Sequence, residues 1–256
     1  MKRAGLFHRG KKSSTFPLGF VLFAIVLICF AAGCVSAGKA ALLEQRDPIA
    51  LVSVVSNVDI HWKDEAPINP KSSNLLSKKA RRKNPDLAIA VTAEELIVSA
   101  ESIFRNHIAD SELINLADKE KVLSAAAYQD ARINKYQADW EMVKPEDYRL
   151  VDFRDKNFFP AMASETGIQR FMFVDFYFTT AMASGVGKTG NGIAELEMRV
   201  LIVDSRGKTI YRKVIPGWSR STVKVSNGAY PKTGMMGLFH AAIDDACFDF
   251  LDQLED

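Results

Sequence analysis

The feature that most constrains this chain is Phe16–Ala32, a run of 17 residues that are almost all apolar. Five basic residues and no acidic residue come before it, and small residues continue from Ala31 to Gly33. A basic start, an apolar middle and a small-residue exit are the three parts of an export signal. We therefore expect residues 1–33 to be a cleaved signal peptide, and the folded part of the chain to follow it.

The residues at the end of this segment, Ala31-Ala32-Gly33-Cys34, resemble the lipobox of bacterial lipoproteins, with Ala31 in place of the usual Leu. Loose lipoboxes of this kind are common in spirochaetes. The resemblance implies cleavage between Gly33 and Cys34, a diacylglyceryl thioether on the Cys34 sulfur, and acylation of the new amino terminus by chains such as palmitate. Each buried methylene adds about 0.8 kcal/mol of membrane affinity, so two or more chains anchor a protein stably.

Two other interpretations of the segment stay open. Residues 13–38 carry no charge, which is long enough for an uncleaved membrane helix, and a plain secretory signal cleaved near Ala37 would leave no lipid. On the lipobox interpretation the protein is lipid-anchored in the cell membrane and faces the periplasm. Val35, rather than Asp, is the second residue after cleavage, and by the rule known for enteric bacteria this favours the outer membrane.

The composition after cleavage suits one folded domain. Removing residues 1–33 from 256 leaves 223 residues, and removing five of the 33 basic residues leaves 28 Lys and Arg against 31 Asp and Glu. The resulting net charge of −3 gives no reason to expect nucleic acid as a partner. Cys34 and Cys247 are the remaining cysteines. With Cys34 lipidated no intramolecular disulfide can form, so the fold depends on its core.

Four segments have the period of an amphipathic helix. They are Thr92–His107, Lys119–Ala131, Phe158–Glu165 and a last segment from Gly234 to about Leu254. Thr92 and Glu95 form the sequence pattern of a capping box, and Gly167 follows the third helix in the usual C-terminal position. Cys247 lies on the apolar side of the last helix, so we expect an inert core thiol rather than a nucleophile.

Strand patterns alternate with these helices. The predicted strands are Ile49–Ser56 with a half-exposed continuation to Trp62, a short strand at Leu113–Leu116, and a hairpin of Ala194–Val203 and Thr209–Ile215 that ends at Pro216. Gly185–Gly192 is interpreted as a flexible loop. It is not a phosphate-binding loop, because Met182 stands where that motif requires its first glycine.

Phe171–Thr180 is the most strand-like segment of the chain, because both of its faces are apolar. It is therefore expected to be a central strand. Asp175 interrupts one of the two faces. A buried carboxylate is costly unless it is hydrogen-bonded or paired, so Asp175 is either a satisfied structural acid or a residue of a sheet edge or a site.

The domain organisation follows from these patterns. Residues 34–47 are small and polar and form a tether, and residues 48–256 form a single domain. A flexible loop interrupts that domain at about residues 63–86, where three prolines fall. The loop carries a basic run that either contacts anionic lipid headgroups or is solvated. Its charged members are Lys78, Lys79, Arg81, Arg82 and Lys83.

The order of elements predicts an α/β (α+β) fold in which a mixed sheet of about 4–6 strands packs with 3–4 helices. From Leu113 onward this order resembles the periplasmic lipoprotein domains of the curli-secretion and penicillin-binding-protein-activator kind. The likeness rests on a short strand and helix at Leu113–Ala131, a helix and strand at Phe158–Thr180, the hairpin around Asp204–Lys208, and the closing helix. The resemblance implies a protein-binding module that faces the periplasm, and it carries no catalytic residues.

The sequence contains no convincing catalytic constellation. His61, His107 and His240 are scattered, without metal-ligand spacing, and no serine lies in a nucleophile elbow. We therefore expect a non-catalytic binding or assembly module, with an envelope protein or a second copy as partner and no cofactor besides the lipid. The alternative is a binder or hydrolase of a lipid or other hydrophobic small molecule. A pocket lined by Asp175 and a histidine would favour that alternative, and a flat apolar patch would favour a protein partner.

Overall fold

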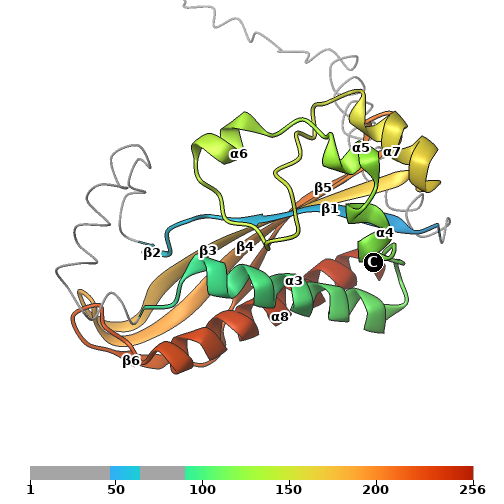
Figure 1. Ribbon diagram of the computed structural model, residues 1–256. Helices are drawn as coiled ribbons and strands as arrows, with labels where there is room; N and C mark the ends of the chain where they lie inside the picture. Colours follow the sequence, from blue (N-terminus) through green and yellow to red (C-terminus); the bar gives the residue numbers. More distant parts are fainter. Residues whose placement is uncertain (1–46, 64–89, 256) are drawn as a thin grey trace, which may run out of the picture. The chain divides into compact units, whose positions relative to one another are not determined.

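The computed structural model describes residues 47–63 and 90–255 (Figure 1). The expected cleavage site at Gly33, the lipidated Cys34 and the basic run lie outside the described residues. Cleavage, lipidation and headgroup contact by Lys78, Lys79, Arg81, Arg82 and Lys83 therefore stay predictions. The described residues belong to one compact unit, Lys39–Asp256.

A mixed sheet of six strands forms the centre of this unit, as the sequence predicts. Its main strands lie in the order β1 (Ile49–Ser56), β3 (Arg170–Val186), β4 (Thr189–Asp204) and β5 (Thr209–Trp218). The first pair is parallel and the others are antiparallel. Two short strands extend the sheet, β2 (His61–Trp62) beside β3 and β6 (Val223–Val225) beside β4.

Helices lie on both sides of the sheet (Figure 1). They are α3 (Ala93–Ser111), α4 (Lys119–Leu123), α5 (Ala126–Gln129), α6 (Lys135–Asp139), α7 (Phe158–Thr166) and α8 (Lys232–Glu255). The long helices α3 and α8 run side by side in the same direction. Two side-chain contacts join them, Lys232 with Glu95 and His107 with Asp244. In each pair the two residues are 137 positions apart in sequence, so the helices run in the same direction. We call the face of the sheet that they cover the helical face.

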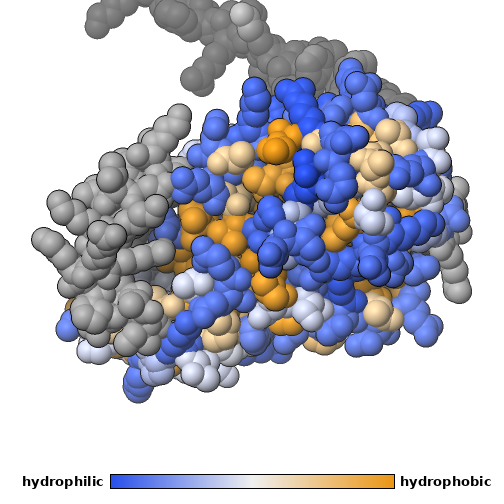
Figure 2. Space-filling view, in the orientation of Figure 1, coloured by the Kyte–Doolittle hydropathy of each residue, from blue (hydrophilic) through white to orange (hydrophobic). Residues whose placement is uncertain are grey.

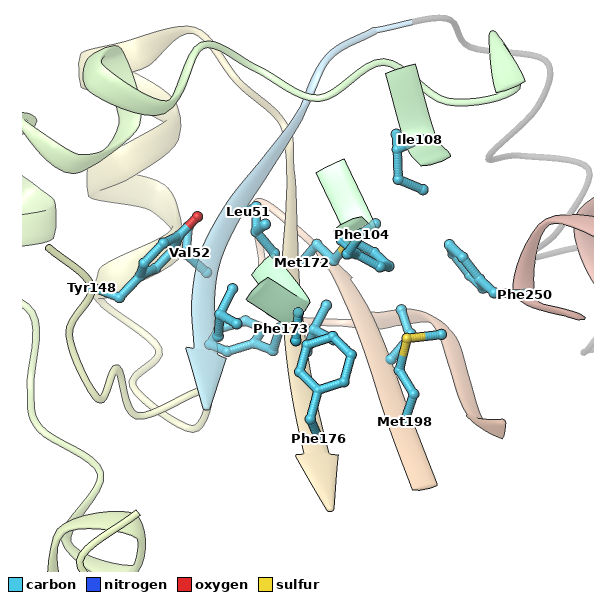
Figure 3. Close-up of a cluster of buried hydrophobic side chains, with 14 of the residues drawn as sticks. Leu51, Val52, Phe104, Ile108, Tyr148, Met172, Phe173, Phe176, Met198 and Phe250 are labelled. Atoms are coloured by element: carbon cyan, nitrogen blue, oxygen red, sulfur yellow. The ribbon is translucent and has the colours of Figure 1, made fainter. Parts of the chain in front are cut away.

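The main core lies between this face and the two long helices. Phe176 of β3 meets Phe104 of α3 with ring centroids 6.5 Å apart, and Phe104 stacks on Phe250 of α8 at 6.0 Å. Figure 3 shows these rings gathered with Met198 of β4. All four side chains are buried. Each large apolar side chain removed from water contributes about 1.5–3 kcal/mol, so this cluster is a main source of stability.

The predicted strands and helices are largely confirmed, and the capping box is present. The Thr92 hydroxyl accepts from the Glu95 backbone N–H at 3.3 Å, while the Glu95 carboxylate accepts from the Thr92 N–H at 3.1 Å. The C-terminal Gly167 has a φ of 77°. Glycine reaches this left-handed conformation without the steric penalty of a Cβ.

Two predicted segments differ in the structure. Lys119–Ala131 is helical as predicted but is divided into α4 and α5. The Glu165 carboxylate accepts from the Ala126 and Ala127 N–H groups, at 2.7 and 2.8 Å, and so caps the start of α5. Leu113–Leu116 is reduced to a single bridge between Leu116 and Ile49.

The predicted continuation of the first strand to Trp62 is also wrong in part. The Asn57 side chain takes the place of a strand backbone, donating to the Phe178 carbonyl at 2.9 Å and accepting from the Phe178 N–H at 2.8 Å. Pairing resumes only at His61 and Trp62 in β2. One polar side chain thus replaces the regular ladder between the two strands.

The interpretation of Gly185–Gly192 as a flexible loop is wrong. β3 and β4 continue to Val186 and Thr189 as one long hairpin, joined by the two residues Gly187 and Lys188. Gly187 has a φ of 57°, which suits the first central position of a tight hairpin turn. Pro216 likewise does not end β5, which continues to Trp218. Proline is tolerated there because β5 is the last strand in the main order of the described sheet.

Candidate binding surface

The second face of the sheet, opposite α3 and α8, is covered only in part. Phe159 of α7 lies over Phe171 and Phe173 of β3, with ring centroids 5.6 and 6.2 Å apart. Beyond Phe173, the residues of β3 on this side are half-buried rather than buried; they are Asp175, Tyr177 and Thr179. α7 therefore covers this face of β3 up to Phe173 and leaves the residues beyond it partly exposed.

Strand register fixes what this uncovered part presents. Across β3, β4 and β5, three rows of residues share one side, because alternate residues of each strand point the same way. The rows are Asp175–Arg199–Val214, Tyr177–Glu197–Pro216 and Thr179–Glu195–Trp218. We call these nine residues the open face. All six residues of the open face on β4 and β5 are half-buried or exposed, and Val214 and Trp218 are 54% and 45% exposed.

Aromatic side chains from α6 lie next to the open face. Burial raises the pKa of Tyr177, and Tyr136 of α6 adds to the rise, so Tyr136 lies in the neighbourhood of the second row. Tyr136 and Trp140 have ring centroids 5.6 Å apart and are 57% and 43% exposed. Figure 2 shows that hydrophobic side chains break the largely hydrophilic surface in several patches on the side that it displays. Exposed aromatic groups of this kind are typical of places where proteins meet.

Buried hydrogen bonds hold the segment that carries α6. Val143 pairs with Ser56 at the end of β1, through N–H to carbonyl distances of 2.8 and 3.0 Å. The Tyr148 hydroxyl donates to the buried Glu101 carboxylate of α3 at 3.1 Å and accepts from Arg105 at 2.6 Å. Burial raises the pKa of Tyr148, so this hydroxyl keeps its proton at every physiological pH. The segment is fixed from two sides, which sets α6 firmly beside the sheet.

Arg199 is the central charge of the open face. Its guanidinium donates from Nε to Glu197 at 2.6 Å and lies over the Tyr177 ring, 4.2 Å from the ring centroid. A second nitrogen of the same guanidinium forms an ion pair with Glu197. At the border of the face, Glu195 pairs with Lys63 at 2.7 Å. Charge and aromatic surface therefore occur together in one place.

Asp175 lies opposite Arg199 in the strand register but is not bonded to it. Within the described residues no hydrogen bond reaches the Asp175 carboxylate. Burial raises its pKa to about 6, and the nearby Arg199 charge opposes that rise without cancelling it. Of the two interpretations of Asp175 from sequence, the satisfied structural acid does not fit this geometry, and β3 is central, so Asp175 is not at a sheet edge either.

Of the other candidate residues, His61 lies beside Thr179 at the border of the open face, and the rest lie away from it. Cys247 is buried in the core, and burial raises the pKa of its thiol strongly, as expected for an inert cysteine. His107 bonds Asp244 at 2.9 Å between α3 and α8, and His240 is also on α8, so both belong to the helical side. Among the described residues no group of three or more His, Cys, Asp or Glu is placed to hold a metal ion.

Sequence reasoning singled out Asp175 but missed Tyr136, Trp140 and Trp218. Their signal was weak, since the first two lie in an irregular, charged segment and the third lies beyond the proline that was expected to end its strand. For the described part of the chain, no helix has both the length and the apolar character needed to cross a membrane.

The fold and this surface define an α+β domain with one sheet face covered by two helices and the other half open. The sequence matches no protein-family model and no curated protein. Among solved structures, the chain is similar to the hypothetical protein CT253 from Chlamydia trachomatis, with a TM-score of 0.37 and 10% identity over 82% of this chain and 94% of that one. It is also similar to the LpoB C-terminal domain from Salmonella enterica, with a TM-score of 0.26 and 11% identity over 72% and 95% of the two chains. Both structural similarities are weak.

Proposed function

We propose that this chain is a lipid-anchored protein of the bacterial cell envelope that binds another protein through its open face. Cys34 would carry the lipid, and the domain would face the periplasm, with the outer membrane favoured by Val35. The single observation that carries the binding role is the uncovered part of the sheet, where aromatic, aliphatic and charged side chains stand exposed together.

The composition of this surface suits a protein partner. Tyrosine, tryptophan and arginine are the residues most enriched at the centres of protein interfaces. Tyr177, Trp218 and Arg199 belong to the open face itself, and Trp140, the residue after α6, packs against Tyr136 of that helix. A stable interface takes about 20–30 residues on each side, so a partner that occupies the nine residues of the open face would also contact α6 and the outer side of β5.

A small hydrophobic ligand is less well supported. That alternative calls for a pocket shared by Asp175 and a histidine. His107 and His240 lie on the helices of the opposite side, and His61 pairs with Thr179, four residues along β3 from Asp175. The exposed side chains of the open face stand in rows along β-strands, which is a broad surface rather than an enclosed one. We therefore favour the protein partner.

Photo-crosslinking in cells tests this proposal. The full chain carries p-benzoylphenylalanine in place of Trp218 or, separately, Trp140, and the control carries it in place of Phe248, which is 58% exposed on α8. We expect both surface positions to capture the same protein, identified by mass spectrometry, and the control position not to capture it. Equal capture from all three positions, or none from the two on this surface, would rule out the open face as the binding site.

The same experiment separates a foreign partner from self-association. A crosslinked product of twice the mass of the chain, from Trp218 and Trp140 alike, would identify the partner as a second copy. Its absence, together with a product that contains another envelope protein, would identify a hetero-complex.

A further inference from the structure

Asp175 is the least satisfied charged group of the open face. It lies in a central strand, with Phe173 and Tyr177 two residues away on either side and Val55 of β1 beside it. Val55 carries no polar side-chain atom, and among the described residues no hydrogen bond from β1 reaches the carboxylate. A carboxylate in such apolar surroundings is costly unless a donor reaches it.

The groups that act on Asp175 can be named from each neighbouring element. Arg199 of β4 and Tyr177 of β3 interact with Asp175 itself. Glu197 of β4 and Tyr136 of α6 act on these two neighbours. Arg199 is the one cation among them, and its Nε and a terminal nitrogen are bonded to Glu197. The Asp175 and Glu197 carboxylates therefore share the Arg199 guanidinium, and the hydrogen bond and the ion pair of that guanidinium go to Glu197.

Charge on the open face is consequently unbalanced. Lys63 neutralises Glu195, and Arg199 neutralises Glu197, which leaves Asp175 as one uncompensated negative charge when it is ionised. Its pKa of about 6 means that it is mostly ionised at neutral pH. The tyrosine ring of Tyr177 beside it adds an aromatic surface, and aromatic rings attract cations.

We propose that Asp175 receives a cationic side chain, a lysine or an arginine, from the protein that docks on the open face. This inference rests on the proposed function and names the chemistry of its partner. An anionic group would meet the excess negative charge, and an apolar group would leave the carboxylate without a donor. A second copy docked through the same face would bring two such carboxylates together, so self-docking is disfavoured.

The test uses the full chain with p-benzoylphenylalanine at position 218, and the probe is the protein that this chain captures. Three further chains carry Asp175→Asn, Asp175→Glu or Asp252→Asn as well. Asp252 is exposed on α8, so its substitution removes the same charge from the chain at a distant place. We expect Asp175→Asn to reduce capture at pH 7.5 at least tenfold, Asp175→Glu to retain part of it, and Asp252→Asn to leave it unchanged.

A pH series on the chain without further substitutions gives a second readout that no folding defect can imitate. Capture should fall as the pH decreases through about 6, because protonation removes the charge that holds the cation, and it should be flat with pH in Asp175→Asn. Undiminished capture by Asp175→Asn would overturn this inference while leaving the proposed function standing. If the chain captures nothing at any pH, the proposed function and this inference fail together. If the captured protein is a second copy and capture persists in Asp175→Asn, the inference of a cationic partner group is overturned as well.

Discussion

Asp175→Asn should stabilise the isolated protein at neutral pH. The carboxyl of Asp175 has a folded-state pKa of about 6 against an ordinary value of 3.8, because burial disfavours its ionised form. One pKa unit corresponds to about 1.4 kcal/mol, so a rise of roughly two units puts the destabilisation by the ionised carboxylate at about 3 kcal/mol. Asparagine has nearly the same shape and no charge, and we expect it to recover about 1–3 kcal/mol at pH 7.5.

The sign of the pH dependence follows from the same shift. Below about pH 4 the carboxyl is protonated in both the folded and the unfolded chain, so its contribution is zero. Between about pH 4 and 6 the unfolded chain loses the proton first, and the free energy of unfolding falls as the pH rises. Above about pH 6 the loss is complete. The stabilisation by Asp175→Asn should therefore shrink by roughly half between pH 7.5 and pH 5.

Urea unfolding of the full chain, followed by circular dichroism at these two pH values, measures the effect. Asp252→Asn is the control, and an exposed site of this kind should change the free energy of unfolding by less than about 0.5 kcal/mol. If Asp175→Asn instead destabilises the protein at pH 7.5, the carboxylate has a donor that satisfies it. Asp175 would then not be an unpaired charge, and a cationic group on the partner would no longer be expected.

Three further outcomes can be checked. Phe104→Ala removes a buried ring from the main core and should lower the free energy of unfolding by about 3–5 kcal/mol in urea titrations; a loss below 1 kcal/mol would contradict the packing. Gly217→Ala should destabilise the protein measurably in the same assay, because the new Cβ would lie 2.2 Å from the Ala242 carbonyl oxygen, whereas Gly237→Ala meets no atom within 4 Å and should be neutral or stabilising. Cys34→Ser should abolish incorporation of labelled palmitate into the full chain, and labelling that survives would exclude the lipobox interpretation.

Regular patterns in the sequence predicted most of the sheet and the long helices, because period and burial agree over many residues. The apolar faces of Ile49–Ser56 and Phe171–Thr180 indicated buried strands, and the capping box at Thr92 located the start of α3 within one residue. Elements that depend on distant residues were not predictable in this way. The start of α5 is set by Glu165, which is 39 residues from the first amide that it caps.

The candidate surface was accessible to sequence reasoning only in part. Asp175 stood out because a carboxylate in an apolar strand is rare, but its neighbours depend on the register of β3 with β4. That register is set by the turn at Gly187 and Lys188 together with a bulge between Met182 and Ser184, which shifts the pairing by one residue. No local pattern in this glycine-rich segment indicates either feature. The approach of α6 to Tyr177 depends on tertiary contacts of the segment around Tyr148, which no local pattern encodes.

The parallel pairing of β1 with β3 has a consequence for how the chain reaches its native state. The contact between Asn57 and Phe178 joins residues 121 positions apart. Non-local pairings of this length slow folding, because a large loop must close before the contact is gained. Until the second half of the chain is present, β1 is a strand of buried type that lacks its main partner, β3. Such a strand is prone to associate wrongly with other chains. The yield of folded protein should therefore depend more on how soon β3 is synthesised after β1 than on the free energy of unfolding of the finished domain.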